Sequence, residues 1–194
     1  MQDGTVYDQD SQVPSGDINH PQIVFSGAGW VKLYVDDFNA GVVRVRGNST
    51  VNLKSKTSDF EDLVFYLNLD GVSGEVEGDV SYLVSLTDGI TFLSSAIKNI
   101  TGVANEFPTR LFRTSGLSIQ IADNVSISTM NSKIFQITSS QLTVQSLHNL
   151  VNALYLNNDQ NGTLNITNNT IPDAATLAMI TEMTTNRGWT ITHD

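Results

Sequence analysis

The residues best suited to chemistry are three carboxylates that alternate along one short segment. Glu75, Glu77 and Asp79 are spaced two apart, so an extended chain presents all three on one face. With Asp70 nearby, they offer the oxygen ligands that Ca²⁺ prefers. The segment contains neither an EF-hand loop nor a calcium-binding nonapeptide repeat, and acidic alternation also protects exposed sheet edges. We therefore favour a solvated acidic edge over a calcium site, and we expect no bound metal.

The histidines do not form a catalytic or metal-binding set. His20, His148 and His193 are far apart and lack the spacing of a metal site or a triad. The sequence also lacks the nucleophile-elbow, zinc-protease, P-loop and dinucleotide-binding motifs. We therefore expect a protein that is not an enzyme, with no catalytic residues and no cofactor. A polysaccharide depolymerase is the enzymatic alternative, and it requires a pair of carboxylates in a groove.

The charge balance argues against nucleic acid as a partner. The 194 residues include 20 acidic and 10 basic ones, for a net charge of −10, whereas phosphate binding requires a positive surface. Five basic residues alternate with apolar ones within 25 positions, which is typical of the solvent face of antiparallel strands: Lys32, Arg44, Arg46, Lys54 and Lys56.

The chain contains no cysteine, so disulfides and thiolate metal sites are excluded. The first 20 residues have no basic region and no apolar run, so we expect no secretory signal. No stretch approaches 18 consecutive apolar residues, so we expect no membrane insertion.

Short strand signals recur through the C-terminal two-thirds of the chain. An apolar–x–apolar pair returns every 22 to 27 residues. A period of this length is typical of a solenoid, in which each unit buries its apolar face on its neighbours. The six pairs are Leu67/Leu69, Ile90/Phe92, Leu117/Ile119, Leu142/Val144, Leu164/Ile166 and Trp189/Ile191. We therefore predict a β-rich α/β solenoid over residues 59–194.

The residues before this repeat predict two further units. Residues 1–21 are polar and acidic without periodicity, which indicates an arm that becomes ordered only against a partner. Residues 22–58 alternate apolar and polar side chains between turn signals, the pattern of antiparallel hairpins. We interpret residues 22–58 as a small antiparallel β module that caps the first repeat. A separate docking module is the alternative.

The last part of the chain predicts two helices and a closing strand. Apolar residues at helical spacing predict a short helix through Leu147, Leu150, Val151 and Leu154. Asp173 and Gly188 mark the start and the end of a longer helix over residues 174–186. We expect Trp189, in the strand that follows, to close the apolar core as part of a C-terminal cap.

Several segments resemble degenerate leucine-rich repeats. Residues 63–74 read LVFYLNLDGVSG and residues 147–157 read LHNLVNALYLN. The ending over residues 174–191 resembles the closing segment of leucine-rich-like proteins from Bacteroidetes and their bacteriophages, which are typically surface or virion proteins. The resemblance covers residues 60–194. It implies a leucine-rich-like coil with short strands, and it carries over no functional residue.

The resemblance and the composition together predict a structural protein of a bacteriophage virion, in the capsid, a fibre or the tail. It would mediate assembly or host-surface recognition through a solenoid surface. We expect other virion subunits as partners, in a homo-oligomer or a larger assembly, and also a host-surface glycan or protein. The expected location is the virion. The alternative is a leucine-rich adhesin or glycan-binding domain at the bacterial cell surface.

Overall fold

The computed structural model describes eight stretches of the chain: residues 29–31, 42–44, 51–57, 66–68, 73–84, 89–92, 100–108 and 110–194. The predicted arm over residues 1–21 lies outside them, as do His20 and Asp70. The boundaries between the three predicted units remain predictions. No helix in these stretches has the length and apolarity needed to cross a membrane.

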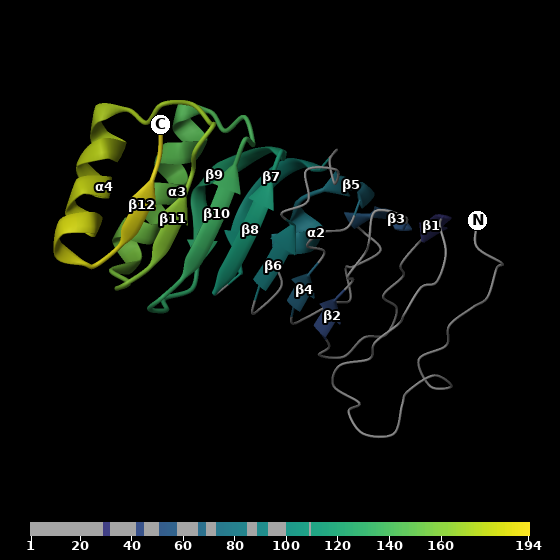
Figure 1. Cartoon of the computed structure of the whole chain (residues 1–194). Coiled ribbons are helices and arrows are strands. Elements are labelled where there is room, and N and C mark those ends of the chain that lie inside the picture. The colour runs from purple at the N-terminus through teal and green to yellow at the C-terminus, as the bar shows by residue number, and fades with distance from the viewer. Residues whose placement is uncertain are drawn as a thin grey trace, which may run out of the picture.

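Two parallel sheets form the structure (Figure 1). The five-stranded sheet has the order β1-β3-β5-β7-β9, and the seven-stranded sheet has the order β12-β11-β10-β8-β6-β4-β2. The strands of the first are β1 (Gly29–Val31), β3 (Val51–Lys56), β5 (Ser73–Asp79), β7 (Ile100–Phe107) and β9 (Ser118–Ile127). Those of the second are β2 (Val42–Arg44), β4 (Tyr66–Asn68), β6 (Gly89–Phe92), β8 (Leu111–Ser115), β10 (Ile134–Thr138), β11 (Thr163–Asn165) and β12 (Thr190–Thr192).

Consecutive strands alternate between the two sheets as far as β10. A short helix, α2 (Ser81–Val84), lies between β5 and β6. Beyond β10, the helices α3 (Val144–Asn157) and α4 (Ala174–Asn186) replace the strands of the five-stranded sheet, while β11 and β12 extend the other sheet. Figure 1 shows α4 and β12 at the same end of the molecule, away from β1 and β2.

The predicted leucine-rich-like solenoid is wrong. The described residues form an α/β fold with open parallel sheets and show no closed or solenoid sheet. Two of the six apolar pairs do not belong to the seven-stranded sheet. Leu117/Ile119 lies at the start of β9 in the five-stranded sheet, and Leu142/Val144 lies at the start of α3. An apolar–x–apolar pair identifies a buried face, but it does not say which sheet holds the strand.

The predicted antiparallel module over residues 22–58 is also wrong. Gly29 of β1 lies beside Val51 of β3 in a parallel pair, and Val42 of β2 lies beside Tyr66 of β4 in another. Alternating apolar and polar residues indicate a strand with one exposed face, but they do not give the direction of its neighbour. Successive strands here belong to different sheets, so no two of them pair as a hairpin.

The apolar core is a single cluster to which both sheets and both long helices contribute. Its centre holds three phenylalanines: the ring of Phe107 meets those of Phe112 and Phe135 edge-on, with centroid distances of 4.7 and 5.8 Å. Phe112 and Phe135 are fully buried and adjacent in the seven-stranded sheet. Aromatic pairs in this arrangement contribute about 0.5–1.5 kcal/mol beyond the area they bury.

The predictions for the C-terminal helices are confirmed. The longer helix spans Ala174–Asn186, and the Asp173 side chain accepts a hydrogen bond from the Thr176 backbone N–H at its start. Gly188 follows with φ at +68°, a conformation that favours glycine. Trp189 is buried, as expected for a residue that closes the core.

Helix α3 covers the edge of the five-stranded sheet at β9. Its polar side chains bond with the backbone of β9: Ser146 Oγ accepts from Ile121 N at 3.0 Å, and Asn149 Nδ2 donates to Ile121 O at 2.7 Å. Near the other end of the helix, Asn157 Nδ2 donates to Ile127 O at 2.5 Å. The side chains of α3 thus replace the hydrogen bonds that a further strand would make.

Replacing Asn149 with Leu is expected to lower the free energy of unfolding by about 1–3 kcal/mol, because Ile121 O loses a hydrogen bond in a buried site. Urea denaturation followed by circular dichroism measures this loss. Asn152→Leu, at a half-exposed position of the same helix, is the control and should change stability by less than about 0.5 kcal/mol. Equal losses in the two variants would contradict the edge-covering role.

Candidate functional site

The predicted acidic residues lie inside the five-stranded sheet, not at its edge. Their strand β5 is flanked by β3 and β7. Glu75 and Glu77 lie beside Lys54 and Lys56 of β3 in the register, and Glu77 and Lys56 are both exposed. The described residues contain no group of three or more side chains arranged to hold a metal ion. The exposed Lys56 beside the exposed Glu77 favours a charge-paired outer face over a calcium site.

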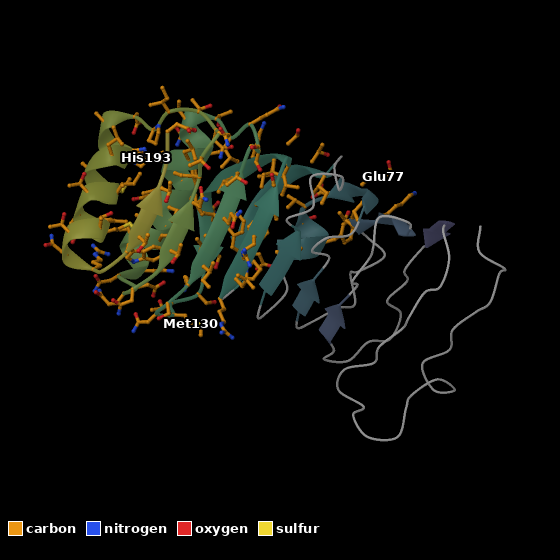
Figure 2. The ribbon with its side chains drawn as sticks, in the orientation of Figure 1. Glu77, Met130 and His193 are labelled. Carbon is orange, nitrogen blue, oxygen red and sulfur yellow. The ribbon has the colours of Figure 1, made fainter. Side chains whose placement is uncertain are left out.

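Asp79 has a local structural role. Its Oδ1 accepts a hydrogen bond of 2.8 Å from the Ser81 backbone N–H, at the start of α2. Hydrogen bonds from the backbone and the side chain of Ser81 lower the pKa of the Asp79 carboxyl. Figure 2 shows Glu77, two residues earlier, well separated from His193, with the strands of the sheets between them. The acidic segment and this histidine therefore do not share a site.

His148 contacts the start of α4. Its Nδ1 atom lies 3.0 Å from Thr176 Oγ1 and 3.9 Å from Asp173 Oδ1. Thr176 is fully buried, so its hydroxyl is not accessible as a nucleophile, and Asp173 caps the helix. The three residues therefore join α3 to α4 and do not form a catalytic set.

The pKa of Asp173 makes this contact sensitive to acid. Hydrogen bonds from the Thr176 side chain and backbone, with a smaller effect of His148, lower it below its ordinary value of 3.8. A carboxyl with a lowered folded-state pKa contributes stability above its unfolded pKa, and this stability is lost as the pH falls through the folded value. We expect Asp173→Asn to lower the melting temperature at pH 7 and to match the wild type once the pH lies below the lowered folded-state pKa of Asp173. Asn also caps helices well, so this variant tests the charge alone.

Asp173→Ala is the matching variant for the cap itself. It removes both the charge and the hydrogen-bond acceptor, so its melting temperature should stay below that of the wild type at both pH values. A constant difference between the wild type and Asp173→Asn from pH 7 to pH 2 would contradict the assigned pKa shift. Thermal melts in matched low-salt buffers give both comparisons.

The structure contains a buried ion pair that no sequence pattern indicates. Lys133 Nζ lies 2.8 Å from Asp159 Oδ2, and both side chains are fully buried. Lys133 also donates to the backbone carbonyls of Ser128 and Met130, and Asp159 Oδ1 accepts from Met130 N at 2.8 Å. The pair joins the loop after β9 to the loop after α3. Since neither side chain reaches solvent, it stabilises the fold and does not bind a ligand.

The outer face of the seven-stranded sheet is the best candidate for an interaction surface. Side chains alternate along its strands, so that Phe112 and Phe135 point into the core while their neighbours point outward. The register aligns one residue from each strand in a line that we call the polar row, and its residues in β8, β10, β11 and β12 point outward. Its members are Arg44, Asn68, Thr91, Arg113, Gln136, Asn165 and Thr192.

A second line of residues, which we call the mixed row, runs beside the polar row. It comprises Val42, Tyr66, Gly89, Leu111, Ile134, Thr163 and Thr190. Ile134 is 41% exposed although it is a large apolar residue, and Thr163 and Thr190 are exposed as well. Hydrogen-bonding groups and apolar groups thus lie side by side on this surface.

The two sheets differ in charge. The seven strands of the larger sheet include two arginines, Arg44 and Arg113, and no Asp, Glu or Lys. The five-stranded sheet holds two lysines and five acidic residues: Glu75, Glu77, Asp79, Glu106 and Asp123. The strands of the larger sheet therefore carry no carboxylate, although the chain as a whole has a net charge of −10.

Comparison of the chain with protein-family models, with curated proteins and with solved structures finds no match.

Proposed function

We propose that this chain is a non-enzymatic protein of assembly and surface recognition that acts through the outer face of its seven-stranded sheet. The setting that we propose is a bacteriophage virion, where the chain is a capsid, fibre or tail-associated component. Its partners are neighbouring virion subunits and a molecule on the host surface. The virion setting rests on the resemblance of residues 174–191 and on a composition rich in Asn, Thr and Gly, and not on the leucine-rich-like coil that the fold contradicts.

One observation carries the proposal: the outer face presents polar side chains in register, and its strands carry no carboxylate. Gln136, Asn165 and Thr192 lie on three adjacent strands and offer amide and hydroxyl groups. Exposed Ile134 and Thr163 lie next to them in the mixed row. A binding surface needs several hydrogen-bonding groups held by a rigid framework, and a parallel sheet with a packed core supplies one.

The second candidate is a cell-surface adhesin or glycan-binding domain of a bacterium. The polar row favours it, because amides and hydroxyls are the groups that hydrogen-bond to sugar hydroxyls. Both candidates use the same face, and they differ in where the protein is located. Copurification with phage particles favours the virion, and retention on bacterial cells without phage favours the cell surface.

The proposal is tested by placing a charge on the face. Thr163→Glu adds a carboxylate at an exposed position of the mixed row, and Gln120→Glu adds one at an exposed position of β9 in the other sheet. Light scattering and imaging of the purified chain at near-physiological salt give the size of the native species, and sedimentation with phage particles or cells gives binding.

We expect the wild type and Gln120→Glu to form a large assembly or to bind particles or cells. In Thr163→Glu, the fraction of protein that is assembled or bound should fall at least tenfold. A wild-type chain that stays a monomer and binds neither particles nor cells would contradict the proposal. Equal behaviour of the two variants would exclude the outer face as the binding surface.

A further inference from the structure

The spacing of the polar row suits a linear polymer. Neighbouring strands of a sheet are about 4.8 Å apart, so a row in register offers one side chain at each such step. Four adjacent strands of this sheet, β8, β10, β11 and β12, contribute Arg113, Gln136, Asn165 and Thr192 in this way. This repeat is close to the length of one pyranose unit in an extended polysaccharide. A sugar chain that lies across the strands therefore meets one polar side chain per unit.

The guanidinium group of Arg113 is available to a ligand. Within the described part of the chain, no hydrogen bond or ion pair holds it, although the residue is half-buried. A guanidinium group binds a carboxylate through two parallel hydrogen bonds. Since none of the seven strands carries Asp or Glu, a carboxylate that Arg113 binds must come from outside this sheet surface.

The neighbouring positions suit the rest of a sugar chain. Asn165 Oδ1 accepts hydrogen bonds from Thr167 N at 3.1 Å and Thr167 Oγ1 at 2.9 Å, which fixes its carboxamide and leaves the Nδ2 group as donor. Gln136 and Thr192 add further donors and acceptors. Leu111 and Ile134 in the mixed row provide an apolar strip against which the C–H face of a pyranose ring can pack.

The second arginine lies on the same line. In the register, Arg44 is three strands away from Arg113, or about 14 Å. The chain as a whole carries a net charge of −10, so two arginines are too few for the phosphates of a nucleic acid.

We propose that the polar row binds a linear polysaccharide that bears carboxylate groups, lying across the strands with one carboxylate on Arg113. This inference rests on the proposed function, because it names a ligand for the same face. Gln136, Asn165 and Thr192 hydrogen-bond to the hydroxyls of successive sugar units, and Ile134 contacts a ring face.

Calorimetric titration with two matched sugars tests this. The probes are a β-1,4-linked mannuronate hexamer and a β-1,4-linked mannose hexamer, which share a backbone and differ in their carboxylates. We expect the full chain to bind the mannuronate hexamer at least tenfold more tightly than the mannose hexamer. Arg113→Gln should lose this preference. Lys56→Gln, which removes one positive charge from the other sheet, should keep it.

Several results would overturn the inference. They are equal affinity for the two hexamers, no binding of either at millimolar concentration, equal losses in Arg113→Gln and Lys56→Gln, or equally tight binding of a phosphate oligomer. If the hexamers fail while Thr163→Glu still abolishes assembly or cell binding, the proposed function stands and the ligand class is wrong. If Thr163→Glu has no effect either, the proposed function fails as well.

Discussion

Replacing Lys133 with Met is expected to lower the free energy of unfolding by about 3–5 kcal/mol, because it leaves the buried carboxylate of Asp159 without its positive partner. Both side chains are fully buried, and the Nζ and Oδ2 atoms are 2.8 Å apart. Among the described residues, Asp159 Oδ2 accepts no well-aligned hydrogen bond. The positive charge of Lys133 therefore compensates for the burial of this carboxylate. Urea denaturation followed by circular dichroism at pH 7 gives the loss.

Lys133 also holds a loop. Its ammonium group donates to the carbonyl groups of Ser128 and Met130, which the Met variant leaves unsatisfied. Asp159→Asn separates the two contributions: its amide oxygen can still accept from Met130 N, but the negative charge is gone and the ammonium group is left unpaired. We expect the free energy of unfolding of this variant also to fall by several kcal/mol.

The double variant Lys133→Met/Asp159→Asn decides whether the two charges act as a pair. Its loss should be clearly smaller than the sum of the single losses, since neither charge then remains buried alone. Additive losses, or a single loss below about 1 kcal/mol, would contradict the ion pair. Lys56→Met, at an exposed position of β3, controls for the effect of removing a lysine.

Features of the fold that depend on neighbouring residues could be predicted from the sequence. The helix over residues 174–186 follows from a capping Asp173 and a Gly188 just past its end, and both act within one turn of the helix. The burial of Trp189 follows from its place after this helix. These signals are local, so the identity of the residues determines the structure.

The arrangement of the strands could not be predicted, because it depends on contacts between distant residues. Phe112 aligns with Phe135 and Phe135 with Leu164, at separations of 23 and 29 residues. The second separation is longer because the connection between the paired strands β10 and β11 contains the 14-residue helix α3. A regular period cannot represent a chain that alternates between two sheets and then exchanges strands for helices.

The candidate surface was missed for the same reason. Arg113, Gln136 and Asn165 stand in one row only when the register of β8, β10 and β11 is known. The sequence instead drew attention to Glu75, Glu77 and Asp79, whose alternation is visible without a structure. Once the register is known, the neighbouring Lys56 accounts for Glu77, and the hydrogen bond to the start of α2 accounts for Asp79.

Trp189→Ala should lower the free energy of unfolding by about 3–5 kcal/mol, because it removes the largest side chain at the end of the core and leaves a cavity there. The residue is 2% exposed. Its ring lies against Gly162, where an added Cβ would lie 2.4 Å from the ring. The collapse that would fill the cavity is limited, because Gly162 lies next to β11, which is paired on both sides.

The indole N–H adds a polar contact that a second variant isolates. Trp189 Nε1 donates to Asp159 O at 2.9 Å, so the tryptophan also holds the loop that carries the buried aspartate. Trp189→Phe keeps most of the apolar area but leaves that carbonyl without its donor, and we expect a loss of about 1–3 kcal/mol. Since Lys133 and Trp189 both act on Asp159, combining Trp189→Phe with Lys133→Met should lose less than the sum of the two. Circular dichroism in urea gives all these values, and a loss below about 1 kcal/mol in Trp189→Ala would place the ring outside the core.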